Sequence, residues 1–171
     1  TLPKPALLPL VRFLSSFDRR AIPHWALNDY LDRIAGYNIR LQHPVPERAA
    51  LLVIDMQHYF KAVAEPIVAN VASLIQTCRE IGIPVIHTRH GHQDPKQDGG
   101  MLARWWGDSI MVKTRDWEWI KGMVPHKTDT VIDKRRYNAF TDTVLAERLE
   151  ALEVEELIIA GVMSNGCCET T

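Results

Sequence analysis

The chain has 171 residues, 46% of them hydrophobic, and a formal net charge of -1. This length and apolar content are those of one globular domain with a core of its own. Charges of both signs are spread along the chain, and no apolar run reaches the ~20 residues of a membrane span. These features argue against nucleic acid or a membrane as a partner and favour a small-molecule substrate.

The cysteine pattern points to a reducing compartment. The chain has three cysteines, Cys78, Cys167 and Cys168. An odd number with two neighbours is not a disulfide framework. The first residues, from Thr1 to Pro5, lack the charged and apolar regions of a signal peptide. We therefore expect a cytoplasmic protein.

The first part of the chain differs from the rest. Residues 1–47 are rich in proline and contain no clear strand pattern, although short helices are plausible at 6–17 and 25–35. We interpret residues 1–47 as an N-terminal arm and residues 48–171 as the folded domain.

Strands and helices are expected to alternate from residue 48 onward. Apolar runs predict strands, and apolar residues at three- and four-residue spacing predict helices. The expected strands cover 50–55, 83–88, 128–134 and 156–161, and the helices cover 67–81 and a segment from about 142. This alternation predicts an α/β fold with three layers, in which helices cover both faces of a parallel sheet.

A long segment from residue 89 to about 110 is rich in glycine, aspartate and tryptophan. We expect it to be a loop, and loops of this length in compact domains are usually functional.

Three reactive side chains are expected at one edge of the sheet. Asp55 ends the first strand, Lys134 ends the third, and Cys167 follows the fourth by one turn. Ligands of parallel sheets bind at the carboxyl ends of the strands. A cation and a helix N-terminus lower the pKa of a thiol, and a carboxylate can move its proton. The alternative is plain: buried cysteines are often inert, and Asp55 and Lys134 would then be a simple ion pair.

Three segments resemble the signatures of the isochorismatase-like hydrolases in order and separation. They are Val53-Ile54-Asp55-Met56-Gln57, Lys134-Arg135-Arg136-Tyr137-Asn138-Ala139-Phe140 and Gly161-Val162-Met163-Ser164-Asn165-Gly166-Cys167. The resemblance covers residues 48–171. It implies a six-stranded parallel sheet of Rossmann type and a catalytic triad of Asp55, Lys134 and Cys167.

The resemblance also implies details of the site. It implies a cis peptide bond between Val162 and Met163, an oxyanion hole made by the N–H groups of Met163 and Cys167, and dimers or tetramers. The closing strand and helices of the family are missing, which suggests a truncated chain.

Asn138 stands where the family usually has Ser, and we expect it to tune the pocket. Cys168 should point into the fold, and Cys78 should be core.

A histidine cluster follows the second strand. His87, His90 and His92, with Asp94 after them, suggest a metal site, a substrate contact or a surface loop. The nicotinamidase branch of the resembled superfamily holds a metal beside its triad, but its Asp-x-His pattern is not visible here. We expect neither a metal nor another cofactor.

Aromatic and polar side chains near the strand ends are candidates for substrate contact, because pockets are mostly apolar with few polar groups. Trp105 and Trp106 could form a lid or pack, whereas Trp117 and Trp119 are better placed in the core or an interface. The candidate contacts are Gln57, Phe60, Arg89, Trp105, Trp106, Tyr137 and Phe140.

Three functions remain open from the sequence. The first is a cysteine hydrolase that cleaves a C–N bond of a small amide, ureide or carbamoyl compound through a thioester. The second is isochorismatase, which releases pyruvate and a dihydroxy-dihydrobenzoate. The resemblance disfavours it, because siderophore-type isochorismatases have Gly at the position of Cys167. The third is a non-enzymatic binding module on the same fold.

Overall fold

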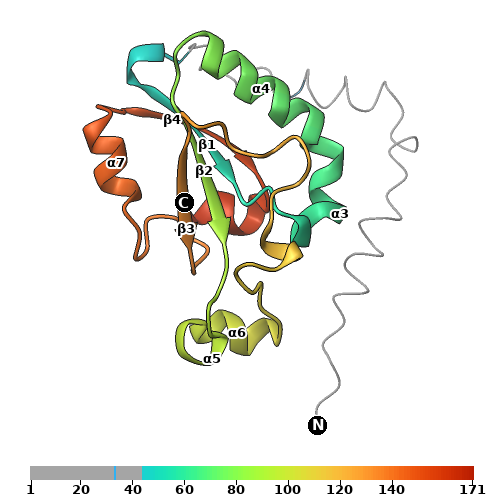
Figure 1. Ribbon diagram of the computed structural model, residues 1–171. Helices are drawn as coiled ribbons and strands as arrows, with labels where there is room; N and C mark the ends of the chain where they lie inside the picture. The colour runs from blue at the N-terminus through green and yellow to red at the C-terminus, as the bar shows by residue number, and fades with distance from the viewer. Residues whose placement is uncertain (1–32, 34–43) are drawn as a thin grey trace. The chain divides into compact units, whose positions relative to one another are not determined.

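The computed structural model describes Arg33 and residues 44–171 (Figure 1). The expected N-terminal arm, with its two helical segments, lies outside these residues apart from Arg33 and its last four positions. Pro44–Thr171 forms one compact unit, and everything below concerns this unit.

Four parallel strands build the sheet, in the order β3-β2-β1-β4. They are β1 (Ala49–Ile54), β2 (Val85–His90), β3 (Thr130–Lys134) and β4 (Glu156–Gly161). The α/β fold with a parallel sheet is confirmed. The described residues contain four strands, whereas the family resemblance implied six.

Helices cover both faces of this sheet, as predicted (Figure 1). On one face, α4 (Val68–Glu80) packs Val71, Ile75 and Cys78 against alternate residues of β1. On the other face, α7 (Leu145–Ala151) and the short helical turn η6 (Ser164–Cys168) pack against the remaining residues of β1. Because β1 is covered on both sides, all six of its residues are buried, which explains its unbroken apolar run.

The helix boundaries differ from the expected ones by a few residues. The start of α7 shifts from Asp142 to Leu145, because Asp142 has φ 55°, in the left-handed region that a helix cannot contain. Gly82 has φ 84° and follows the end of α4, a position where glycine is common because it adopts the left-handed conformation readily.

The expectation of an unstructured segment from residue 89 was wrong. β2 continues to His90, and two helices follow, α5 (Pro95–Asp98) and α6 (Gly100–Trp106). Asp94 caps α5 by accepting a hydrogen bond from the Lys96 N–H at 3.0 Å. Shorter turns complete the described chain: η2 (Pro46–Arg48), η3 (His58–Phe60), α3 (Lys61–Ala64), η4 (Glu65–Ile67) and η5 (Arg115–Trp117). Among the described residues, no helix has the length and apolar content needed to cross a membrane.

The contact between β1 and β4 yields a prediction for Gly161. A Cβ atom at this position would lie 2.1 Å from the carbonyl oxygen of Ile54, and Gly161 has φ 129°. We expect Gly161→Ala to lower the free energy of unfolding by about 3 kcal/mol or more, from backbone strain plus overpacking. Urea denaturation measures this loss.

Gly82→Ala is the matched control for this experiment. Gly82 also has a positive φ, but a Cβ atom added there would meet no heavy atom within 4 Å. Its substitution should cost only about 1 kcal/mol of backbone strain. Equal losses for the two variants would contradict the close approach of β1 and β4.

Candidate active site

Asp55 directly follows β1, where the chain leaves the sheet. Its side chain is fully buried and its backbone has φ 49°, a left-handed conformation that Asp tolerates better than most residues. The Thr88 hydroxyl donates a 2.7 Å hydrogen bond to Asp55 Oδ1, and the backbone N–H of Asp55 donates to the Thr88 carbonyl at 3.2 Å. Asp55 is therefore held by the neighbouring strand β2 through both its backbone and its carboxylate.

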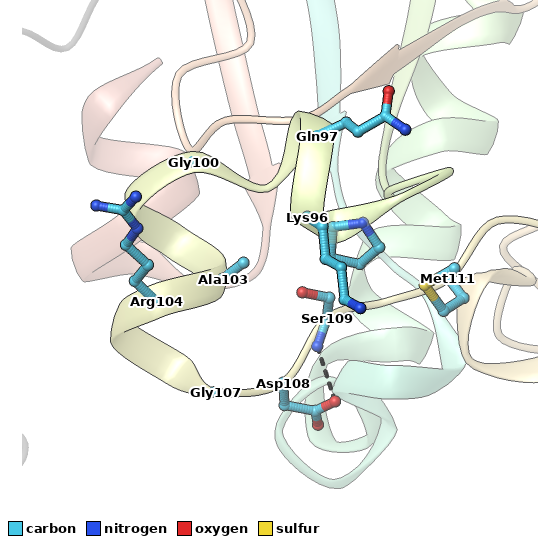
Figure 2. A pocket seen from close by; sticks show the side chains of 10 residues that line it. Lys96, Gln97, Gly100, Ala103, Arg104, Gly107, Asp108, Ser109 and Met111 are labelled. Carbon is cyan, nitrogen blue, oxygen red and sulfur yellow. Dashed lines mark hydrogen bonds between the residues drawn. The ribbon is translucent and has the colours of Figure 1, made fainter.

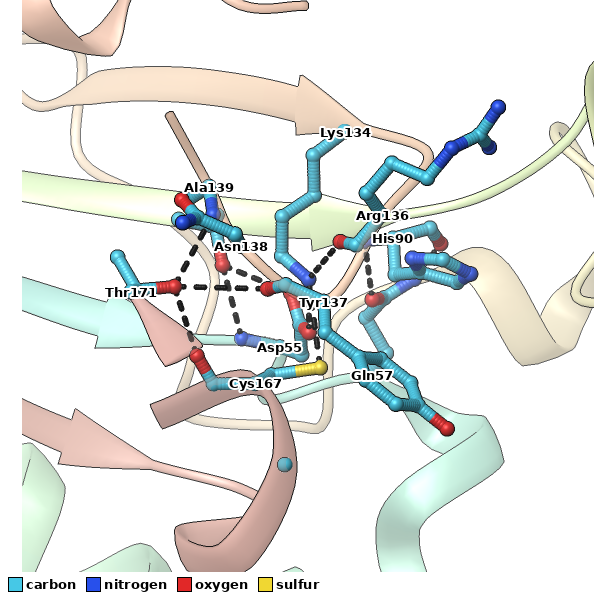
Figure 3. Close-up of polar contacts among 12 residues, drawn as sticks. Asp55, Gln57, His90, Lys134, Arg136, Tyr137, Asn138, Ala139, Cys167 and Thr171 are labelled. Atoms are coloured by element: carbon cyan, nitrogen blue, oxygen red, sulfur yellow. Dashed lines mark hydrogen bonds and ion pairs between the residues drawn. The ribbon is translucent and has the colours of Figure 1, made fainter. Parts of the chain in front are cut away.

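Lys134 ends β3 and joins the other two reactive groups (Figure 3). Its Nζ lies 2.7 Å from Asp55 Oδ2, 3.4 Å from Cys167 Sγ and 3.0 Å from the Arg136 carbonyl oxygen. The side chains of Lys134 and Asp55 are both inaccessible to solvent. Asp55 Oδ1 is bonded to the Thr88 hydroxyl, so Oδ2 is the carboxylate oxygen that pairs with Lys134.

Cys167 lies in η6, and 5% of its surface is exposed. Its carbonyl accepts a 2.7 Å hydrogen bond from the Thr171 hydroxyl, which in turn accepts one from the Ala139 N–H at 3.0 Å. The nearby Val162–Met163 peptide bond is cis, as the resemblance implied. The turn that carries the thiol is thus tied to the segment that follows Lys134.

The thiol of Cys167 is harder to ionise than expected. Burial raises the pKa of Cys167 to about 12, the negative charge of Asp55 and a hydrogen bond to it add to this rise, and Lys134 opposes it. Lys134 does lower this pKa, as expected, but desolvation and the Asp55 carboxylate outweigh one ammonium, so the net shift is upward. At neutral pH the free thiol is therefore protonated.

Two of the expected substrate contacts are bonded to other parts of the protein. Gln57 is fully buried, and its amide bonds to backbone groups of His90 and Trp117. Arg89 pairs with Asp133 at 2.8 Å and stacks on the ring of Trp117, 3.3 Å from its centroid. Neighbouring strand residues point to opposite faces, so Arg89 lies on the face opposite Lys134. The predicted contact of these two side chains with a substrate stays untested.

The aromatic candidates spread from the core to the surface. Phe60 is half-buried against the α4 face of the core, whereas Phe140 is exposed. Trp105 is 73% exposed, and Trp106 donates its indole N–H to the hydroxyl of Tyr137. α6 is thereby attached to the segment after Lys134, in which the Arg136 carbonyl accepts a hydrogen bond from Lys134 Nζ. The lid role of Trp105 and Trp106 stays a prediction.

The histidines separate into two groups. His87 is buried on the α4 face, 3.1 Å from Asp129, and its pKa is lowered by burial. His90 and His92 stack edge to face on the other side of β2, and His92 lies 3.0 Å from Asp98. Burial and the charge of Lys134 lower the pKa of His90 to about 4, so its imidazole is neutral. Within residues 44–171, no three His, Cys, Asp or Glu side chains are grouped as metal ligands.

The remaining cysteines and Asn138 have structural environments. Cys78 is core, as predicted. Cys168 is half-buried against the α7 face of the core, and burial raises its pKa to about 11. The side chain of Asn138 accepts a 2.7 Å hydrogen bond from the Phe140 N–H, so it shapes the local turn. Its predicted effect on the pocket stays untested.

An open hollow of about 700 Å³ lies beside α5 and α6, apart from the triad (Figure 2). None of Asp55, Lys134 and Cys167 lines it, and its walls are largely solvent-facing, so we do not assign it as the reaction site. Its lining residues are Pro95, Lys96, Gln97, Gly100, Ala103, Arg104, Gly107, Asp108, Ser109 and Met111.

Residues 49–171 match the isochorismatase domain, which is the region that carries the triad geometry. The chain belongs to the isochorismatase family of hydrolases. It is 46% identical over 138 residues to Nicotinamidase 3 of Arabidopsis thaliana, covering 79% of this chain and 69% of that protein. It is 33% identical over 133 residues to the phenazine biosynthesis protein PhzD of Pseudomonas fluorescens, covering 75% of this chain but 64% of that protein.

A solved structure has the same fold. The cysteine hydrolase from Pseudomonas syringae pv. phaseolicola 1448A superposes with a TM-score of 0.71 at 30% identity, covering 76% of this chain and 67% of that one. The family assignment therefore rests on both sequence and structure, while the chain spans about two thirds of the length of these relatives.

Three supporting groups of this isochorismatase-family site were missed from the sequence. They are the Thr88 hydroxyl, the Thr171 hydroxyl and the Arg136 carbonyl. Thr88 sits at the carboxyl end of the second predicted strand, so its proximity to Asp55 could have been inferred. The other two depend on how the loops after β3 and β4 fold against each other.

The charge arrangement predicts how the thiol titrates. In a Cys78→Ala/Cys168→Ala background, Cys167 is the only thiol, and its alkylation by iodoacetamide should still be rising at pH 10. Asp55→Asn removes a charge that raises the pKa of Cys167, so the midpoint of the pH–rate profile should fall by at least about one unit. An unchanged midpoint would contradict the contact between the carboxylate and the thiol.

Proposed function

We propose that this protein is a cysteine-dependent hydrolase that cleaves the C–N bond of a small carboxamide through a thioester. The observation that carries the proposal is a buried ammonium, Lys134 Nζ, shared by the Asp55 carboxylate at 2.7 Å and the Cys167 thiol at 3.4 Å. This places a nucleophile, a base and a cation around one point. An ion pair with a purely structural role does not require a thiol in contact with it.

The first half of the reaction begins with removal of the proton from the thiol. Asp55 accepts it as Sγ bonds to the carbonyl carbon, and the electron pair of the C=O bond moves onto oxygen. The N–H groups of Met163 and Cys167 are our candidates for holding this oxyanion. When the C=O bond re-forms, the C–N bond breaks and Asp55 returns the proton to the departing nitrogen, which releases ammonia or an amine.

The second half of the reaction regenerates the thiol. A water molecule attacks the thioester carbonyl and gives a proton to Asp55, and the C–S bond then breaks. The sulfur recovers that proton and a carboxylic acid leaves. Lys134 supports both halves, because its ammonium stabilises the negative charge on sulfur and that on the carboxylate in turn. The three groups thus supply the chemistry from the chain's own side chains.

A carboxamide on an aromatic ring is the first substrate to test. The Arabidopsis relative is named a nicotinamidase, and the structural neighbour is named a cysteine hydrolase. Both names fit a nucleophilic cysteine. Dimers or tetramers and a cytoplasmic location stay predictions for this protein.

Isochorismatase activity is the second candidate, because the matched domain carries that name. The reaction cleaves a vinyl ether by acid catalysis and uses no thiol. The observation against it is the placement of Cys167 beside Lys134, which a vinyl ether hydrolase does not need.

Substitution of the nucleophile tests the proposal directly. The wild-type protein should release ammonia from nicotinamide, and Cys167→Ala should lower kcat by at least about 1,000-fold, since no thioester can form. Cys168→Ala is the matched control. Cys168 is the adjacent thiol, but among the described hydrogen bonds Lys134 donates to the sulfur of Cys167 and not to that of Cys168. The Cys168→Ala variant should retain most of the activity.

Two results would overturn this assignment. Activity that survives Cys167→Ala would exclude the thioester. If nicotinamide and other amides, ureides and carbamoyl compounds are inert while pyruvate is released from isochorismate, the second candidate is correct.

A chelator is expected to leave the activity unchanged. The proposed mechanism assigns every proton transfer to Asp55. The nearby side chains of His92 and Asp98 are bonded to each other, with 3.0 Å between His92 Nδ1 and Asp98 Oδ1. Activity should be assayed before and after dialysis against EDTA. A loss that zinc restores would contradict the mechanism as written.

A further inference from the structure

Gln57 is a fully buried polar side chain whose hydrogen bonds all go to backbone groups. Its Nε2 donates to the carbonyl oxygens of His90 and Trp117, both at 2.9 Å, and its Oε1 accepts from the N–H of His90 at 2.8 Å. A buried amide with three good bonds is a rigid connection between the segments that it joins.

This amide replaces a missing strand pairing. β1 ends at Ile54, whereas β2 continues to His90, so the last residues of β2 have no β1 backbone beside them. Gln57 bonds to both the N–H and the C=O of His90, as the backbone of a neighbouring strand would. The chain beyond β1 is therefore attached to β2 although the two no longer pair.

The same residue is bonded to Asp55. The backbone N–H of Gln57 donates to the Asp55 carbonyl at 2.7 Å. Asp55 itself has φ 49°, a conformation that non-glycine residues adopt only when their surroundings impose it. An attachment two residues later, on the strand that also carries Thr88, is a physical reason for this conformation to persist.

Trp117, at the other end of this connection, is itself held in place. Trp117, whose carbonyl accepts the third bond, lies under the guanidinium of Arg89, 3.3 Å from the ring centroid. Arg89 in turn pairs with Asp133, one residue before Lys134. The connection thus runs from the chain around Asp55 to the strand that bears Lys134, by way of the opposite face of the sheet.

We propose that Gln57 is a positioning residue: its amide, anchored on the His90 and Trp117 backbone, holds the Asp55 carboxylate against Lys134 and Cys167. The inference rests on the proposed function for the role of Asp55 as the base. Gln57 itself touches no reacting atom. Its loss should therefore change the geometry of the acid–thiol contact and not the binding of substrate.

The test substitutes Gln57 by methionine, which has the same chain length and no amide. In the Cys78→Ala/Cys168→Ala background, the midpoint of the Cys167 alkylation profile should move down toward the Asp55→Asn value, because a displaced carboxylate raises the thiol pKa less. With substrate, kcat should fall at least about tenfold while KM stays within about threefold, as misplacement of a base predicts. Faster alkylation combined with slower hydrolysis is the signature of the proposal.

Ile75→Ala is the control for simple destabilisation. Ile75 is buried in the core between α4 and the sheet and contacts no triad member in the described bonds. It should lower the melting temperature but leave the alkylation midpoint unchanged. If Gln57→Met behaves like Ile75→Ala, with a lower melting temperature and the wild-type midpoint, Gln57 is merely structural and the proposal is wrong.

A second variant covers the case in which Gln57→Met does not fold. Gln57→Asn keeps the amide but is one methylene too short to reach both His90 and Trp117, so a smaller midpoint shift in the same direction is expected. No shift in this variant would overturn the proposal. Alkylation needs no substrate, so these results stand even if the protein hydrolyses none of the amides tested, a failure that concerns only the proposed function.

Discussion

The buried ion pair between Lys134 and Asp55 is the constraint on which the rest of the structure depends. Taking two charges out of water is costly, and the cost is offset only when both groups are well coordinated. The Thr88 hydroxyl donates a hydrogen bond to the Asp55 carboxylate, and the Arg136 carbonyl accepts one from the Lys134 ammonium. Each partner comes from a different strand end or loop, so the pair requires β1, β2 and β3 to be in register.

The same pair determines the charge environment of Cys167, the proposed nucleophile. In many cysteine enzymes a cation keeps the sulfur ionised before the substrate arrives. Here Lys134 is already engaged by Asp55, and burial disfavours the thiolate, so the pKa of Cys167 is about 12. In the proposed mechanism, proton transfer to Asp55 therefore accompanies the attack. The hydrogen bond between the thiol and the Asp55 carboxylate is consistent with that requirement.

The two faces of the sheet explain why residues that are neighbours in sequence have separate roles. Thr88 and His90 lie on the face of Lys134, whereas His87 and Arg89 lie on the face of α4. Thr88 donates a hydrogen bond to Asp55, and the charge of Lys134 acts on His90. On the opposite face, His87 pairs with Asp129 and Arg89 pairs with Asp133. A histidine cluster that looks like a ligand set in sequence is divided by the alternation of the strand.

The sequence by itself predicted the strand segments and the α/β class, because apolar runs are local properties of the chain, and its resemblance to the family named the three candidate catalytic residues. Only the tertiary structure decided the thiol pKa, the location of Arg89 and the use of Gln57. These depend on what surrounds each side chain: the desolvation of Cys167, the face of β2 that carries Arg89, and the unpaired backbone of His90 beyond the end of β1. Burial is set by contacts between distant segments, and the spacing of residues along one segment does not reveal it.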